Sequence, residues 1–204
     1  MNILEDLLSR YPCLCICRDS IQSAFEQIAD AFISGNRLYI CGNGGSASDA
    51  LHIVGELAKS FRLPRSLDQE FIENVSSEVS HNLQGALPAF ALVENAALSS
   101  AYANDVNPEY VFAQQVYAYV RQGDCVMGIS TSGNSKNVLR ALETAKGRGA
   151  VTIGLTGNSG GEMKPLCCVC ITVPETETYK IQELHLSVYH ALCAMLEERF
   201  WGTL

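Results

Sequence analysis

A run of hydroxyl side chains is the first feature of this sequence that could do chemistry. Ser130-Thr131-Ser132-Gly133-Asn134-Ser135 places four hydroxyls in six residues, directly after an apolar stretch and directly before a helical pattern. Hydroxyls together with the free amides of a helix N-terminus form a cradle for phosphate. Tight turns between strands and helices favour the same residue types. Four hydroxyls exceed what a turn requires, so the run predicts an anion site without Lys or Arg.

Two other turns, at residues 42–49 and 156–161, are also rich in Gly and Ser. In the first, the glycines let the backbone approach a ligand closely, and Ser46 with Asp49 has the spacing of a capping box. The turn at residues 156–161 is interpreted as an ordinary turn. Neither GxGxxG nor GxxxxGK[ST] occurs, so the sequence supports no dinucleotide fingerprint and no Walker loop.

A second candidate centre combines imidazole, carboxylate and amide groups. His52 and Glu56 are four residues apart in a helical pattern and share a face. Gln182 and His190, in the last helical pattern, are about 80° apart around the helix axis. A carboxylate and an imidazole beside a sugar phosphate could shuttle protons, and the four groups could also hold zinc. The alternative is that these residues only pack.

The elements that must position these residues alternate along the chain. Apolar runs of buried-strand type are separated by segments of helical periodicity, which predicts βαβ units and a parallel sheet covered on both faces. In such a sheet, ligands bind at the carboxyl ends of the strands, where all three turns lie. The expected strands are 37–41, 89–93, 124–129, 150–155 and 168–173, and the expected helices are 46–62, 134–147 and 178–200.

Two segments lie outside this alternation. Residues 1–35 are expected to be helical and to form either an extra layer on the sheet or an arm for self-association. Residues 62–87 are polar with weak helical periodicity, and we interpret them as a helical excursion or a lid. The remainder is continuous, without repeats or linkers, so residues 1–204 are expected to form a single domain.

Composition excludes several functional classes. The chain has 204 residues, a formal charge of −8, a pI near 5.0 and 48% hydrophobic residues. The apolar fraction is too high for a disordered chain, and the acidic balance argues against binding to nucleic acid or to an anionic membrane. No apolar run is long enough to cross a bilayer, and the first residues are acidic, unlike a signal peptide.

Nine cysteines occur, including a CxCxC run at residues 13–17 and a CCxC run at residues 167–170. An odd number of cysteines in a chain of this length does not suit a secreted disulfide framework. Neither run has zinc-finger spacing. Free thiols in a reducing cytoplasm are the favoured interpretation.

Several motifs occur in one order: CGNGGSA at 41–47, HIVGEL at 52–57, AND at 103–105, STSGNS at 130–135 and IQELH at 181–185 followed by His190. This set resembles the sugar-isomerase (SIS) fold and, within it, the phosphoheptose isomerase family, over about residues 19–200. The resemblance implies a flavodoxin-like three-layer α-β-α sandwich with a five-stranded parallel sheet and added N-terminal helices.

The resemblance also implies an activity and a site. The expected reaction converts sedoheptulose 7-phosphate to D-glycero-D-manno-heptose 7-phosphate through an enediol, toward the heptose of bacterial surface glycans. Glu56 and His190 match the catalytic positions, and His52, Glu56, Gln182 and His190 match the ligands of one zinc ion per subunit. Substrate-binding positions match Asn43, Gly44, Gly45, Ser46, Glu56, Asn104, Asp105, Ser130, Thr131, Ser132, Ser135 and Gln182. The family is tetrameric with sites shared between subunits, and 48% apolar residues leave material for buried subunit faces.

The sequence departs from the family pattern in two places. Residues 62–87 are longer than the link expected in the enterobacterial type, and Ser60 stands where a basic residue is expected. A related sugar phosphate is therefore also compatible with the motifs. A non-catalytic SIS protein that binds a sugar phosphate or a replication initiator is the alternative. All four His, Glu and Gln positions are filled, which favours the enzyme.

Overall fold

The computed structural model of the chain describes residues 2–202. Its centre is a five-stranded parallel sheet of order β2-β1-β3-β4-β5. This is the flavodoxin-like strand order. All five expected strands are confirmed: β1 (Leu38–Gly42), β2 (Ala89–Ala91), β3 (Cys125–Ser130), β4 (Val151–Thr156) and β5 (Val169–Thr172).

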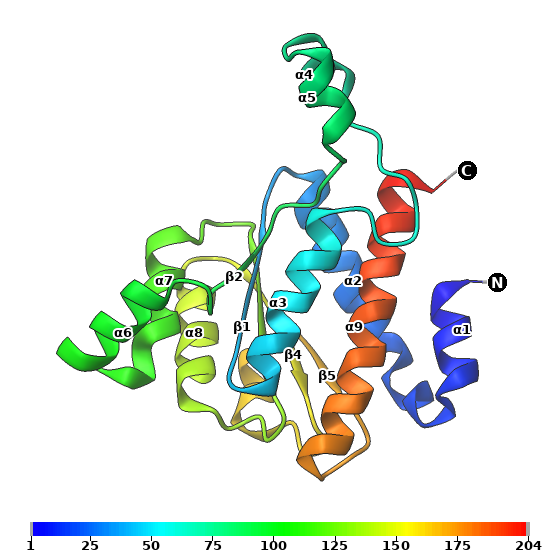
Figure 1. Cartoon of the computed structure of the whole chain (residues 1–204). Coiled ribbons are helices and arrows are strands. Elements are labelled where there is room, and N and C mark those ends of the chain that lie inside the picture. Colours follow the sequence, from blue (N-terminus) through cyan, green and yellow to red (C-terminus); the bar gives the residue numbers. More distant parts are fainter. Residues whose placement is uncertain (1, 203–204) are drawn as a thin grey trace.

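Helices cover both faces of the sheet, as expected for a three-layer sandwich (Figure 1). Alternate residues of β1 show why: Leu38 and Ile40 pack with α2, α3 and α9, whereas Tyr39 and Cys41 pack with α7 and α8. The helices are α1 (Ile3–Arg10), α2 (Arg18–Ile33), α3 (Gly45–Ala58), α4 (Gln69–Glu73), α5 (Ser77–Asn82), α6 (Ala96–Asp105), α7 (Val111–Tyr119), α8 (Lys136–Gly147) and α9 (Thr178–Trp201), with short 3-10 segments η1 (Pro12–Cys17), η2 (Pro108–Tyr110) and η3 (Gly161–Leu166).

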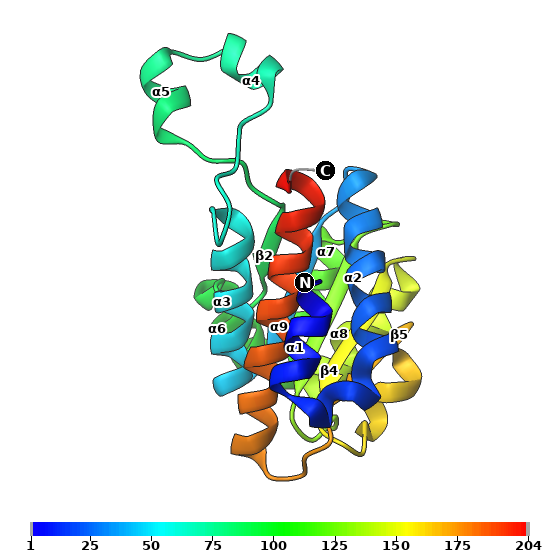
Figure 2. The same ribbon diagram turned by 90° about the vertical axis from the view of Figure 1, so that its right-hand side faces the viewer.

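The N-terminal segment is helical, as predicted, and forms an extra layer. Helix α1 lies along α9, and α2 lies between α9 and β5 (Figure 2). Leu4, Leu7 and Leu8 of α1 are buried in the main core. Because the apolar face of α1 is covered by its own chain, that face is not available to another subunit.

The expected helical excursion is also present. Helices α4 and α5 project away from the sheet at the end where α9 finishes (Figure 1). None of the residues that the structure describes in these two helices is buried. Asp68 and Ser76 cap them by accepting hydrogen bonds from Phe71 N and Val79 N. Local capping therefore holds these short helices where packing does not.

At the base of this projection, the chain is fixed to the body by buried polar groups. Glu197 of α9 accepts hydrogen bonds from the backbone amides of Phe61, Arg62 and Leu63, at 2.8, 2.7 and 3.1 Å. It also pairs with Arg65, whose Nε lies 2.8 Å from the carboxylate. Both side chains are almost completely buried. These contacts end α3 at Ala58, four residues before the predicted end at residue 62.

Candidate functional site

The three Gly/Ser-rich turns lie together at the carboxyl edge of the sheet. The first (residues 42–49) follows β1, the second (residues 130–135) follows β3 and the third (residues 156–161) follows β4. Helix α3 begins within the first turn, at Gly45, and α8 begins directly after the second. Asn43 and Asn137 exchange two side-chain hydrogen bonds of 2.8 and 2.9 Å, which join the first turn to α8. The third turn supports the second, because Gly157 N donates to Thr131 O at 3.0 Å.

The hydroxyl run lies at the end of β3 and the start of α8. The hydroxyls of Ser130 and Ser135 are 2.9 Å apart, and Asn134 N donates to the Ser132 hydroxyl at 3.2 Å. Ser130 is buried, while Ser132 is exposed. The side chain of the N-cap residue Ser135 accepts no hydrogen bond from the first turn of α8, where Val138 N donates to Asn137 Oδ1 at 3.0 Å. The amide end of this helix, which favours anions, therefore faces the hydroxyls.

The structure brings His52, Glu56 and His190 together from α3 and α9, which lie side by side (Figure 1). The Nε2 atom of His52 is 3.2 Å from Glu56 Oε1 and 3.4 Å from His190 Nε2. Glu56 is largely shielded, with 14% of its side chain exposed, whereas 43% of the His52 side chain is exposed. One face of the group is thus open to a ligand, and the carboxylate lies behind it.

Two residues that the sequence motifs do not mark orient His52. Tyr189 donates its hydroxyl proton to Asp49 Oδ1 at 3.3 Å, so its oxygen accepts from His52 Nδ1 at 3.0 Å. The neutral ring then carries its lone pair on Nε2, toward Glu56 and His190. The capping box expected from Ser46 and Asp49 is wrong: Gly44 precedes α3, and the Asp49 carboxylate is used by Tyr189 instead.

Burial, reinforced by the neighbouring His52, lowers the pKa of His190 below the ordinary histidine value. The ring is therefore neutral at neutral pH and can accept a proton or a metal ion. Lys59 Nζ lies 3.1 Å from the second carboxylate oxygen of Glu56, which places a positive charge beside the site. The lysine side chain is 60% exposed, so solvent screens this pair.

Gln182 meets the first turn at Gly45. A Cβ atom on Gly45 would lie 2.4 Å from Gln182 Nε2, so the glycine is needed for this close approach. Gln182 is on α9, two helical turns before His190. The first turn, the amide and the His52–Glu56–His190 group therefore form one continuous surface.

We expect Gly45→Ala to impair substrate binding without unfolding the protein. The new methyl group would push the end of the flexible Gln182 side chain away from the first turn, while the backbone keeps its conformation. KM should rise several-fold, with the unfolding midpoint nearly unchanged. Gly55→Ala is the matched control in the same helix, because a Cβ there meets nothing within 4 Å. An unchanged KM in Gly45→Ala would contradict a role for this contact.

Two of the predicted site residues, Asn104 and Asp105, do not lie on this surface within the single chain. They lie exposed at the end of α6, on the other face of the sheet, where Asn104 Nδ2 donates to Asp105 Oδ1 at 2.8 Å. The structure gives them no hydrogen bond to the other candidate residues within the described range.

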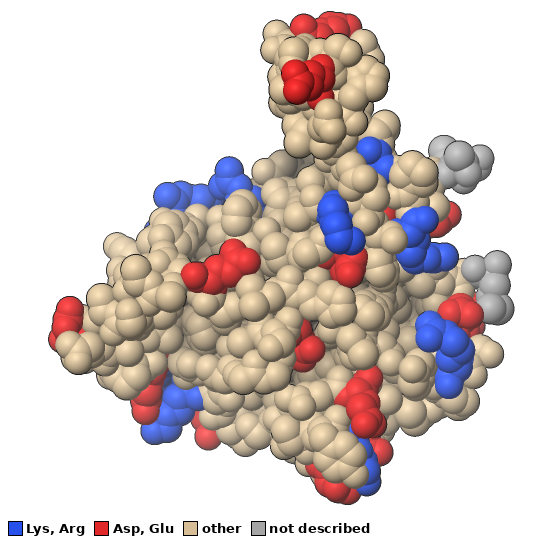
Figure 3. Space-filling model, in the orientation of Figure 1, with Lys and Arg blue, Asp and Glu red and all other residues tan. Residues whose placement is uncertain are grey.

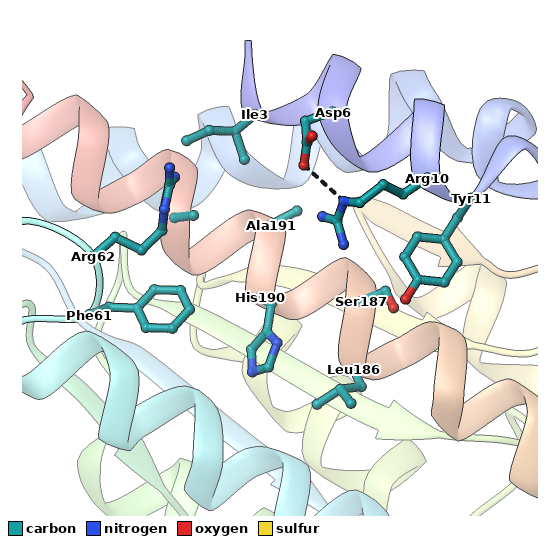
Figure 4. Close-up of a pocket in the computed structure, with 11 residues that line it drawn as sticks. Ile3, Asp6, Arg10, Tyr11, Phe61, Arg62, Leu186, Ser187, His190 and Ala191 are labelled. Carbon is teal, nitrogen blue, oxygen red and sulfur yellow. Dashed lines mark hydrogen bonds and ion pairs between the residues drawn. The ribbon is translucent and has the colours of Figure 1, made fainter. Parts of the chain in front are cut away.

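His190 also borders a cavity of about 500 Å³ between α1, α9 and the segment after α3. Figure 4 shows its ring between Phe61 and Leu186, with Arg10 and Arg62 farther up the same cavity. Arg10 is paired with Asp6 at 2.9 Å. No sequence motif marks either arginine. Arg10 reaches this cavity only because α1 packs on α9.

The charged side chains show no single dominant sign around these elements. On the face in Figure 3, Lys and Arg are interspersed with Asp and Glu. None of the helices described among residues 2–202 has the length and apolar character needed to span a bilayer.

The side chains of His52, Glu56 and His190 include nitrogen and oxygen donors of the kind that zinc binds. Among the described residues, no three His, Cys, Asp or Glu side chains already form a metal cluster. The two separations around His52 Nε2 are nevertheless 3.2 and 3.4 Å. Donors bound tetrahedrally to zinc at 2.0–2.1 Å lie about 3.3 Å apart. The separations around His52 Nε2 therefore suit ligands of one zinc ion.

Comparison with known proteins identifies the class. SIS domain models match residues 17–86 and 97–195. Phosphoheptose isomerases from Trichlorobacter lovleyi and Crocosphaera subtropica are 40% and 42% identical, covering 87% and 91% of this chain and 81% and 85% of theirs. The solved phosphoheptose isomerase from Neisseria gonorrhoeae superposes with a TM-score of 0.77 at 30% identity, over 95% of this chain and 94% of that one.

The fold and the site thus define a SIS-domain protein of the phosphosugar isomerase class. Within that class, the chain belongs to the phosphoheptose isomerase family. The resemblance noted from the sequence motifs is confirmed, and so is the expected fold.

Proposed function

We propose that the protein interconverts sedoheptulose 7-phosphate and D-glycero-D-manno-heptose 7-phosphate, and so supplies the heptose of bacterial surface glycans. The observation that carries this proposal is the approach of Glu56, His52 and His190 beside a neutral phosphate cradle. The reaction moves hydrogen between two adjacent carbons and needs no redox cofactor. The names of the relatives support a seven-carbon sugar phosphate.

In the proposed mechanism, the hydroxyl run and the N-terminus of α8 hold the phosphate. Asn43, Gly44, Gly45, Ser46 and Gln182 align the sugar chain along the first turn. Glu56 removes a proton from the carbon next to the ketose carbonyl, and the carbonyl oxygen takes a proton from solvent, which gives an enediol. The neutral His190 then takes the proton of the hydroxyl on the first carbon and delivers it to the neighbouring carbon, and the reverse exchange applies in the other direction.

A zinc ion would be held by His52, Glu56, Gln182 and His190. When bound, it would polarise the substrate oxygens as a Lewis acid. Tyr189 and Asp49 would act as its supporting groups, since the partner on the far nitrogen of a metal-binding histidine fixes the ring.

If zinc occupies this site, His52→Ala should lower the zinc content of the protein. Elemental analysis of untreated wild type should give about one zinc per chain, and loss of one ligand weakens such sites by at least about 10- to 100-fold. His81→Ala is the control, because His81 lies in the exposed helix α5. Equal zinc in wild type and His52→Ala would contradict this ligand set.

We further propose that the chain is one SIS domain that works as a cytoplasmic homotetramer. Asn104 and Asp105 would then contribute to the site of a neighbouring subunit, which explains their distance from their own. Apolar side chains left exposed on the single chain, such as Leu51, Tyr117 and Leu186, could be covered there. Nine unpaired cysteines suit a reducing compartment.

The decisive experiment is a panel of ketose and aldose phosphates followed by NMR in D2O. An isomerase should incorporate deuterium at the carbon next to the carbonyl and should prefer the seven-carbon sugars. Exchange with a different sugar phosphate would correct the substrate only. A complete lack of exchange, with sugar phosphate still bound, would instead favour the non-catalytic SIS protein.

A further inference from the structure

Three sulfur atoms gather around a single point on the sheet, away from the proposed isomerase site. They are Cys167 Sγ, Cys170 Sγ and Met163 Sδ, which lie 2.8, 3.0 and 3.0 Å from the position that a Cβ on Gly154 would take. They are the three heavy atoms nearest to that position. Met163 is fully buried under η3, and the two cysteines are half-buried.

The sheet is shaped to leave this space. Gly128 of β3 and Gly154 of β4 are register partners, and Cys170 of β5 is the next residue along the same row. A glycine within a strand is less favourable than alanine, because its backbone loses more conformational freedom on folding. At residue 154 the missing side chain is what allows three sulfurs to converge over the backbone.

The sulfur atoms come from backbone that is held in place. Met163 N donates to Gly133 O at 2.9 Å, and Cys168 N donates to Thr152 O at 2.8 Å. Donor positions fixed in this way reduce the entropy cost of binding an ion.

We propose that Met163, Cys167 and Cys170 form a binding site for a monovalent soft metal ion, Cu(I). Thiolate and thioether ligands select Cu(I), whereas structural zinc sites use four Cys or His ligands. Contrary to the expectation that neither cysteine run has zinc-finger spacing, Cys167 and Cys170 have the spacing CxxC. Met163 supplies the third sulfur. On binding, both thiols lose their protons to solvent and the thioether binds without proton loss.

Cys168 provides a control within the same run. Its thiol lies on the Thr152 side, 3.5 Å from the Thr152 hydroxyl, and it is exposed. It therefore tests whether any accessible thiol binds the ion. The exposed Cys13 and Cys15 of the other run could also bind copper. Both are therefore replaced by serine in the parent protein and in every variant made from it.

The test is an anaerobic Cu(I) titration of the full chain against a chromophoric chelator. We expect one Cu(I) per chain, and X-ray absorption should show a shell of three sulfurs. Cys167→Ser and Cys170→Ser should lose the ion, Met163→Leu should bind it about 10- to 100-fold more weakly, and Cys168→Ser should bind it like the parent. Met163→Leu keeps the apolar volume, so it remains informative if a cysteine variant does not fold.

Equal affinity in the parent and in the Cys170→Ser or Met163→Leu variant would overturn the proposal. So would a copper shell rich in nitrogen or oxygen. A Cys167–Cys170 disulfide in the anaerobic protein, detected as a mass lower by two hydrogens, with no copper bound, would also overturn it.

Discussion

Glu56→Gln is expected to abolish isomerisation while the protein still folds and binds sugar phosphate. The amide keeps the shape of the side chain but cannot take a proton from carbon. Loss of a general base typically slows a reaction by about 10²- to 10⁴-fold. The fall should be in kcat, because Glu56 lies behind His52 with 14% of its side chain exposed, whereas the proposed phosphate site is the hydroxyl run.

Two measurements separate this effect from a structural one. Deuterium exchange in D2O reports proton abstraction, and protection of the thermal midpoint by sugar phosphate reports binding. Glu183→Gln is the matched control, because Glu183 is an exposed carboxylate beside Gln182 on α9. Wild-type exchange in Glu56→Gln would rule out Glu56 as the base. If Glu56→Gln lost both deuterium exchange and thermal protection by sugar phosphate, Glu56 would instead be needed for binding.

The sheet could be predicted from the sequence because each strand is a short apolar run, and β1, β3 and β4 are followed by Gly/Ser-rich turns. Only β2 differs appreciably: it ends at Ala91, two residues before the predicted end, as an edge strand with one partner. Helices α6 and α7 were not predicted. None of the residues described in α6 is buried and its sequence has no apolar stripe, whereas α7 has only nine residues and buries Val111, Phe112 and Val116. Periodicity identifies only helices that bury one face.

The site was predictable to the extent that spacing along one helix could define it. His52 and Glu56 share a face of α3, and Gln182 and His190 share a side of α9, but the contact between the two pairs depends on tertiary packing. Tyr189 carries no motif, and Asp49 has the spacing of a cap, so their hydrogen bond to each other was not predictable. The packing of α1 that closes the cavity beside His190 was likewise beyond local pattern.

The largest effect on stability is expected from Glu197→Gln. Glu197 is the carboxylate that fixes the start of the excursion, and Arg65, its partner, also donates to the carbonyl oxygens of Leu57 and Glu56 at 2.6 and 2.7 Å. Those oxygens belong to the last turn of α3, where a helix lacks internal partners. The pair therefore joins α9, the excursion and the helix that carries the proposed base.

Removing one partner of a buried ion pair leaves the other charge uncompensated, which typically costs about 3–5 kcal/mol. We expect Glu197→Gln to lower the free energy of unfolding by that amount. Replacing both partners, as in Arg65→Met with Glu197→Leu, should recover only part of it, because the amides of Phe61, Arg62 and Leu63 would still lack an acceptor. Full recovery would show that the ion pair alone matters.

The pH dependence has a definite sign. Burial alone would raise the pKa of Glu197, but hydrogen bonds from Phe61, Arg65 and Arg62 outweigh it and hold the pKa below the ordinary glutamate value. The stabilisation is therefore complete above the ordinary value and is lost as the pH falls through the lowered pKa. The difference in unfolding free energy between wild type and Glu197→Gln should shrink over that acid range.

Urea unfolding followed by the fluorescence of Trp201 measures this directly. Trp201 is the only tryptophan of the chain, and its ring lies 4.9 Å from the guanidinium carbon of Arg65. Glu198→Gln, at an exposed position, is the control and should change stability by no more than about 0.5 kcal/mol. If Glu197→Gln matched this control at neutral pH, Glu197 would not hold the excursion to α9. Loss of activity in folded Glu197→Gln would show that its hold on α3 also positions Glu56.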